Sequence, residues 1–182
     1  MLFRSGELAI ESGRATEARA HFARAAALST SPYPDRASIM AKCYQALVEE
    51  RGLGFPRLQA MVEAALRQAK ELADVEVHAR CLLNLARIQI EAGRTKEAIA
   101  TLEPLPRDSQ EPLGPELQAQ LLYWHGRATA MNGDASTGES EATLGRDLLA
   151  KRRDSLSERF RSAFASRAEI RSILNDRVRI SR

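Results

Sequence analysis

The sequence has few of the features that mark membrane, secreted or disordered proteins. No run of residues approaches 18 consecutive apolar side chains, which argues against a transmembrane helix, and the N-terminus lacks the zones of a signal peptide. Two cysteines, Cys43 and Cys81, are too few for a disulfide scaffold, so a reducing, cytoplasmic setting is expected. Aromatic residues make up only 5% of the 182 residues, whereas alanine occurs 30 times. This composition predicts a soluble, all-α protein.

Positive charge gathers at the C-terminal end of the chain. The whole chain has a formal net charge of +3, and residues 146–182 hold eleven Lys or Arg against five Asp or Glu. A basic segment of this kind can bind nucleic acid or an anionic surface. Arginine greatly outnumbers lysine throughout the chain, which fits a GC-rich genome better than a selected phosphate site.

A period of forty residues organises most of the sequence. Small residues recur where helices would have to approach closely, and larger apolar residues recur where a face would have to be filled. The four sets are Gly6, Ala46, Ala86, Gly126; Gly13, Leu53, Gly93, Gly133; Ala18, Leu58, Ala98, Gly138; and Phe22, Val62, Leu102, Ala142. This spacing predicts four repeats, at about 1–34, 35–74, 75–114 and 115–153.

Each repeat has the pattern of a helical hairpin. In the third, apolar spacing predicts a helix over about 76–92, followed by a turn at Gly93. Thr95 is the expected N-cap of a second helix, which Pro104 stops. Similar signals predict caps at Thr16 and Asp35, and capping boxes at Ser136 and Ser155.

Two stretches carry a resemblance to a known family. Gly93-Arg94-Thr95-Lys96-Glu97-Ala98-Ile99-Ala100-Thr101-Leu102 and Gly13-Arg14-Ala15-Thr16-Glu17-Ala18-Arg19-Ala20-His21-Phe22 resemble the central turn and second helix of a tetratricopeptide repeat. The resemblance implies a right-handed α-α superhelix of about four hairpins. The forty-residue unit is longer than the family's usual 34 and is similar to repeats in large bacterial signalling and transcription regulators. HEAT or armadillo repeats, whose period is also near forty, are the structural alternative.

Both ends of the array carry further expectations. At the forty-residue step the first helix lacks more than a turn, so we expect the chain to be the C-terminal part of a longer protein. Residues 154–182 are expected to form capping helices and a basic tail, because Leu156, Phe160 and Phe164 form an apolar stripe. Ile170 and Ile173 continue the stripe after an expected break near Ser166.

The sequence offers no catalytic, cofactor-binding or metal-binding constellation. His21, His78 and His125 do not pair at the spacing of a helical metal site, and no phosphate-binding loop or nucleophile elbow occurs. Cys43 and Cys81 lie on the first helices of adjacent repeats, where buried free thiols are favoured over a redox pair. We therefore expect a protein that is not an enzyme and uses no cofactor.

The concave face of the array is the expected binding surface, because the first helix of each hairpin lines it. The repeat alignment places Arg80, Asn84, Arg87, Gln120, Tyr123 and Arg127 on this face. Arg87 and Arg127 occupy equivalent positions forty apart, so two neighbouring guanidinium groups would favour an acidic or C-terminal carboxylate ligand. The alternative is that these arginines pair with acidic neighbours in the chain.

The sequence thus favours a non-catalytic scaffold for protein–protein interaction. The expected partner is a protein or peptide, with acidic groups if the two arginines bind it, and no membrane association is expected. Nucleic-acid or anionic-surface binding through the basic C-terminal segment is the alternative. Its aromatic residues are expected on the apolar stripe, where they could not stack on bases. Homodimerisation through an exposed end of the solenoid is a third possibility.

Overall fold

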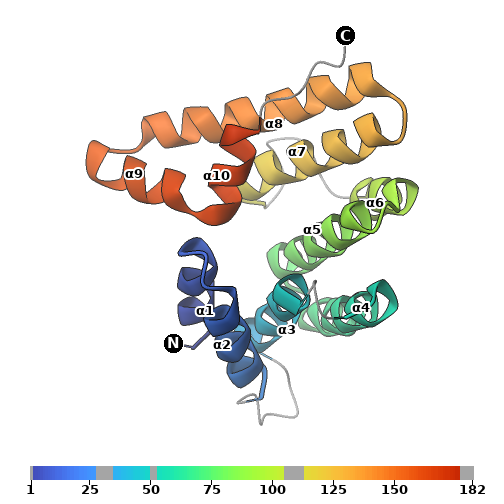
Figure 1. Cartoon of the computed structure of the whole chain (residues 1–182), viewed down its shortest axis with the longest axis vertical. Coiled ribbons are helices and arrows are strands. Elements are labelled where there is room, and N and C mark those ends of the chain that lie inside the picture. Colours follow the sequence, from blue (N-terminus) through green and yellow to red (C-terminus); the bar gives the residue numbers. More distant parts are fainter. Residues whose placement is uncertain (1, 28–34, 50–52, 105–112, 177–182) are drawn as a thin grey trace.

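The protein is all-α in the part that the structure describes. A computed structural model describes residues 2–27, 35–49, 53–104 and 113–176. These residues form ten helices (Figure 1): α1 (Leu2–Glu11), α2 (Ala15–Ala27), α3 (Arg36–Glu49), α4 (Phe55–Leu72), α5 (Val75–Glu91), α6 (Thr95–Leu102), α7 (Pro115–Met131), α8 (Ala135–Ser155), α9 (Glu158–Ser166) and α10 (Ala168–Asn175). The all-α prediction is confirmed.

The helices pack in sequence as antiparallel pairs, which is the arrangement of a tetratricopeptide-like helical repeat. The pairs are α1–α2, α3–α4, α5–α6 and α7–α8, and the first helices of successive pairs contact one another (α1 with α3, α3 with α5, α5 with α7). Each predicted repeat range holds one pair, although α8 continues to Ser155, beyond the boundary expected at residue 153. Each pair therefore packs against the neighbouring pairs, as in other stacked repeats.

The turns inside three of the pairs require a left-handed backbone. Gly13, Gly93 and Gly133 have φ angles of 71°, 73° and 109°. A side chain at such an angle is strained, and a glycine ends each helix at low cost. These three positions belong to one of the forty-residue sets.

Several helix starts differ from the expected caps. Asp35 does cap α3, because its carboxylate accepts the Ser38 N–H at 2.7 Å. Thr95 and Ser136 do not cap α6 and α8: each helix begins earlier, and Asp134 caps α8 by accepting the Thr137 N–H at 3.1 Å. Neighbouring short polar side chains can each cap a different backbone N–H and so start the helix at a different residue, and spacing alone does not decide which one does so.

The same shift occurs at the other two expected caps. Thr16 lies inside α2, which begins at Ala15. Ser155 is the last residue of α8, and Ser157 stands before α9 instead, without a side-chain capping bond.

A small residue of the repeat brings α7 and α8 into backbone contact. A Cβ added at Gly126 on α7 would lie 2.4 Å from the Ala142 nitrogen and 2.5 Å from the Gly138 oxygen, both on α8. Gly6, Ala46 and Ala86, the equivalents of Gly126, are also buried. A forty-residue spacing of small side chains thus records where paired helices touch.

Three apolar clusters run along the array and share helices. Val77, Cys81 and Leu85 of α5 pack with the first two pairs, while Leu83, Ala86 and Ile90 of the same helix pack toward α6 and α7. Tyr123 and Ala119 of α7 pack with α8, α9 and α10. The hydrophobic core therefore extends from each pair to the next along the array and has no single centre.

The C-terminal helices turn back across the concave side. We expected helices that cap the end of the stack, and two helices, α9 and α10, follow α8 with a break between them at Arg167. However, α10 also contacts α1, the first helix of the chain, and the two lie on the same side of the molecule (Figure 1). Its buried side chains, Ile170 and Ile173, face α7 and α8. The array is thus closed on itself by its own last helix.

Phe160 departs from the expected apolar stripe. Its side chain is 57% exposed, whereas Phe164 is buried.

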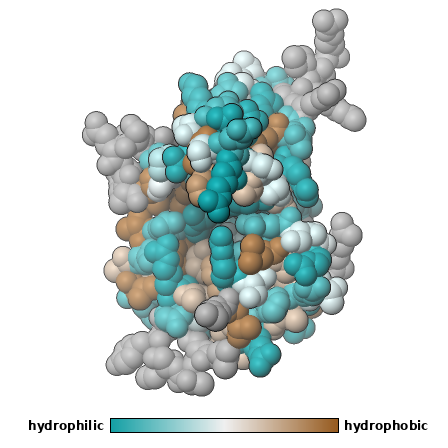
Figure 2. All heavy atoms as spheres, turned by 90° about the vertical axis from the view of Figure 1, so that its left-hand side faces the viewer, coloured by the Kyte–Doolittle hydropathy of each residue, from teal (hydrophilic) through white to brown (hydrophobic). Residues whose placement is uncertain are grey.

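The side of the molecule that carries α1 and α9 is mainly hydrophilic, with small separate hydrophobic areas (Figure 2). The described helices include none that is long and apolar enough to cross a membrane.

Candidate partner-binding face

A cavity of about 460 Å³ opens on the concave side of the array. Four first helices line it: Phe3, Arg4 and Glu7 come from α1, Arg36, Ala37 and Met40 from α3, Glu76 and Arg80 from α5, and Glu116 from α7. Arg167, between α9 and α10, completes the wall. The cavity therefore lies where the repeat architecture predicts a binding surface.

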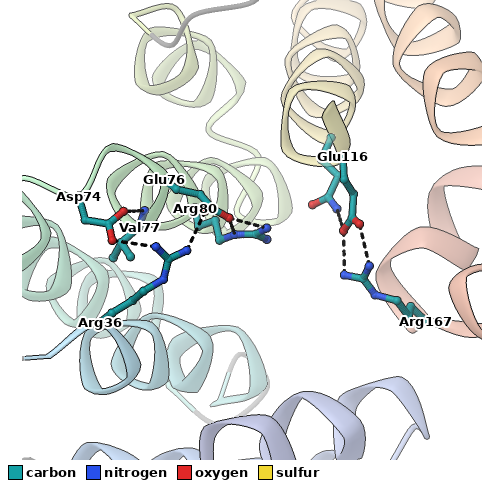
Figure 3. Close-up of polar contacts among 8 residues, drawn as sticks. Arg36, Asp74, Glu76, Val77, Arg80, Glu116 and Arg167 are labelled. Carbon is teal, nitrogen blue, oxygen red and sulfur yellow. Dashed lines mark hydrogen bonds and ion pairs between the residues drawn. The ribbon is translucent and has the colours of Figure 1, made fainter. Parts of the chain in front are cut away.

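An arginine–carboxylate network joins α3 to α5 on one side of this cavity (Figure 3). Arg36 Nη1 lies 2.8 Å from Asp74 Oδ2, and Arg36 Nη2 lies 2.8 Å from Glu76 Oε2. Arg80 donates to the other oxygen of Glu76 at 3.1 Å. The hydrogen bond from Arg36, assisted by Arg80, holds the pKa of Glu76 below its ordinary value. Glu76 is thus a shared acceptor between two repeats.

A second arginine, Arg167, forms the opposite side of the cavity. Arg167 holds both oxygens of Glu116 on α7, each at 2.8 Å, in a bidentate pair (Figure 3). Its Nε lies 3.4 Å from Glu11 Oε1 on α1. One guanidinium group therefore ties the first helix of the chain to the fourth pair.

The six residues predicted for this face fall into three environments. Arg80 lines the open cavity. Asn84 and Gln120 are buried between helices, with 2% and 0% exposure, and cannot meet a partner in this structure. Arg87, Tyr123 and Arg127 lie on the expected side but beneath the C-terminal segment, as described next.

The C-terminal segment supplies the acidic groups that Arg87 and Arg127 were expected to attract. Glu169 Oε1 lies 2.7 Å from Arg87 Nη1. Asp176 Oδ2 accepts the Tyr123 hydroxyl at 2.6 Å and lies 3.4 Å from Arg127 Nη1. Burial, followed by the hydrogen bond to Asp176, raises the pKa of Tyr123. The face expected to be open is therefore occupied by α10 and the residue that follows it.

The two cysteines meet beneath this face as free thiols. Both are fully buried, and Asn84 Nδ2 lies 3.2 Å from Cys43 Sγ. Burial, reinforced by the neighbouring Cys81, raises the pKa of the Cys43 thiol well above its ordinary value. A thiol that stays protonated is a poor nucleophile, which fits a packing role.

Sequence reasoning missed the residues that close the cavity. Arg36, Glu76 and Glu116 stand forty residues apart, so the repeat period already marked them as equivalent positions at the starts of first helices. Glu169, Asp176 and Arg167 carried no such signal, because they lie beyond the repeats. Only the path of the chain brings them to the concave side.

Residues 59–121 match the family model of the tetratricopeptide repeat. The chain contains a tetratricopeptide repeat region. The match begins in α4 and ends in α7, so it spans the α5–α6 pair, where the sequence resemblance was also found. No curated protein and no solved structure matches the chain.

Tetratricopeptide repeats mediate protein–protein interactions and are typically non-catalytic. Within the described residues, no three His, Cys, Asp or Glu side chains gather to hold a metal ion. The cavity lining combines charged side chains with the apolar side chains of Phe3, Ala37 and Met40.

Proposed function

We propose that this chain is a scaffold that binds a partner protein or peptide in the cavity on the concave side of its helical repeats. The observation that carries the proposal is the cavity itself, because α1, α3, α5 and α7 all contribute to its wall. A single segment laid in it would contact all four helical pairs. An extended or helical segment is the natural occupant of such a surface.

The lining favours a segment with mixed polarity. Phe3, Ala37 and Met40 give an apolar floor, and arginines and glutamates alternate around it. Arg4 and Arg36 remain more than half exposed despite their ion pairs. Exposed ion pairs contribute little to stability, so a partner can exchange them at little cost.

The wider setting is proposed from the sequence alone. The forty-residue unit and the stretch Leu156–Arg167 resemble the repeat region and closing segment of large bacterial signalling or transcription regulators. We place the chain in the cytoplasm, as the C-terminal repeat region of such a regulator. An upstream kinase or ATPase domain in the full reading frame would support this placement, and a reading frame that begins naturally at Met1 would contradict it.

Binding to nucleic acid is the second candidate, and one observation favours it. Phe160 is exposed with the Arg159 guanidinium 5.7 Å from its ring centre, as a base-stacking site would need. Against it, Arg146 and Arg161 donate to backbone carbonyls, and Arg153 pairs with Asp154. A steep loss of DNA affinity with added salt, abolished by Phe160→Ala, would revive this function.

The proposal is tested by filling the cavity. Peptides that bind the full chain are selected from a displayed random library, and their affinity is measured by calorimetry. Ala37→Trp places a large ring into the cavity from an exposed position, so it should weaken binding at least tenfold. Ala135→Trp, exposed at the start of α8 and outside the cavity, is the matched control. Unchanged affinity in both variants would place the binding site elsewhere.

A further inference from the structure

The contacts of the C-terminal segment have the form of a ligand seated on the concave face. Glu169 and Asp176 stand seven residues apart, and they reach Arg87 on α5 and Arg127 on α7. Seven helical residues rise about 10 Å. Packed helices lie about 8–10 Å apart. Two turns of α10 therefore match the step from one repeat to the next.

The apolar contacts lie between the two carboxylates. Ile170 and Ile173 are fully buried against a floor that includes Ala119, Tyr123 and Leu149. Along one side, the segment thus presents a carboxylate, then two isoleucine side chains, and then a second carboxylate. The isoleucine pair is placed asymmetrically, since Ile170 directly follows Glu169 and Ile173 stands three residues before Asp176. Reversing the helix would keep the spacing of the two carboxylates but misplace the isoleucines, so the apolar contacts set the direction of the segment.

The segment also leaves polar groups of the face without partners. Arg87 Nε and Trp124 Nε1 are buried donors with no acceptor among the described residues, and the Arg87 guanidinium lies 5.1 Å from the Trp124 ring centre. Buried donors without acceptors are costly. A ligand with another acceptor at this point would bind the same face more completely than α10 does.

Two features make the segment separable from the face. α10 has eight residues, and helices of that length are marginal in water without tertiary contacts. The connection from α8 is extended at Leu156 and Ser157, with ψ angles of 148° and 152°. No helical backbone bond would have to break at this point for α9 and α10 to swing away as a unit.

We propose that α9–α10 is an internal ligand, and that a partner's helical segment with carboxylates seven residues apart and aliphatic residues between them replaces it. This inference goes beyond the proposed function, because Arg87, Tyr123 and Arg127 lie outside the cavity and are covered by the C-terminal segment. Occupation by the chain's own segment lowers the affinity for the partner, because a tethered competitor acts at millimolar effective concentration. The closed array is then the resting state.

The test uses a fluorescent peptide of residues 157–176 added to the full chain. The double variant Glu169→Gln, Asp176→Asn weakens the internal ligand and leaves the face intact. We expect the peptide to bind this variant at least tenfold more tightly than the unaltered chain, as measured by anisotropy. Glu158→Gln with Asp147→Asn removes the same charge from exposed positions and should not change peptide affinity. A peptide carrying the two amide substitutions should bind at least tenfold more weakly.

Two further measurements keep the outcome decisive. If the double variant does not fold, a Gly-Ser insertion after Leu156 lowers the effective concentration of the segment without touching a contact residue. Arg87→Ala with Arg127→Ala, made in the released chain, should abolish peptide binding.

Three results would overturn the inference. One is equal peptide affinity in released and unaltered chains. Another is a released chain that doubles its mass in light scattering, because the occupant would then be a second copy's segment. The third is unchanged peptide binding when Arg87→Ala and Arg127→Ala are made in the released chain, which would leave the proposed function standing.

Discussion

Arg87 Nη1 lies 2.7 Å from Glu169 Oε1, although 82 residues separate the two in the chain. Their side chains are only 18% and 15% exposed, and the Arg87 guanidinium also faces the Trp124 ring. Charges shielded from water in this way interact strongly, and removing one leaves the other desolvated and unpaired. This contact links the third repeat to the C-terminal helices.

A double-mutant cycle should find strong coupling between these two residues. We expect Arg87→Met and Glu169→Gln to interact by about 1.5–3 kcal/mol, as hydrogen bonds to charged groups do. The cycle is measured by urea unfolding. Arg94 and Glu97, paired at 2.8 Å but both nearly half exposed, provide the control. Their coupling energy should be about 0.3–0.5 kcal/mol. Equal coupling energies in the two cycles would contradict the claim that burial strengthens the Arg87–Glu169 contact.

The close approach of α7 and α8 should not tolerate a methyl group. Gly126→Ala would drive a Cβ into backbone atoms of Gly138 and Ala142, which cannot move aside as a side chain would. We expect a loss of about 3 kcal/mol in the free energy of unfolding. Gly114→Ala adds the same atom where nothing lies within 4 Å, and it should change stability by less than about 1 kcal/mol. Similar losses in both variants would refute the packing argument.

The free thiols should resist modification in the folded protein. Burial keeps the Cys43 thiol protonated, because its pKa is raised well above the ordinary value. Iodoacetamide at pH 8 should therefore label neither Cys43 nor Cys81 until the chain unfolds, as followed by intact mass. Rapid labelling of the native protein, with the circular dichroism spectrum preserved, would show that this part of the core opens.

Stability should fall in acid partly through Glu76. Its pKa is lowered in the folded state by Arg36 and then by Arg80, from an ordinary value of 4.5. The stabilisation is therefore complete above pH 4.5 and is lost as the pH falls through the lower folded pKa. Glu76→Gln should unfold more easily than the unaltered chain at pH 7, and the difference should vanish in stronger acid.

The same titration needs a control that removes a carboxylate elsewhere. Glu158→Gln on the exposed surface of α9 should leave stability at pH 7 within about 0.5 kcal/mol of the unaltered chain. A difference between Glu76→Gln and the unaltered chain that stays constant down to pH 2 would mean that Glu76 acts through packing and not through its charge.

The repeats could be predicted because their physical requirements are local and recur. Glycines at the turns, small residues at helix contacts and apolar faces at helical spacing each follow from one repeat and its neighbour. Gly93, Ala86 and Leu102 therefore stand where the forty-residue period expected them. Helix starts were less predictable, as Ser136 and Asp134 show, because nearby side chains can each cap a different backbone donor and so set a different first residue.

The candidate binding face could be predicted only in part. The period placed Arg80, Arg87 and Arg127 on the first helices, and Arg80 does line the cavity. The forty-residue period did not indicate that Asn84 and Gln120 are buried, because the residues that cover them come from adjacent repeats. It also could not tell that Phe160 is exposed, since a stripe on one helix does not state which helix will cover it.

By itself, the sequence determined the helical pairs, their order and the small residues between them, because each depends on interactions within forty residues or between neighbouring units. Only the tertiary structure decided that α10 contacts α1 and that Glu169 and Asp176 meet Arg87 and Arg127. The reason is the path of the chain after the repeats. Extended backbone at Leu156 and Ser157 and a break at Arg167 turn the chain back, so that α10 lies on the concave side.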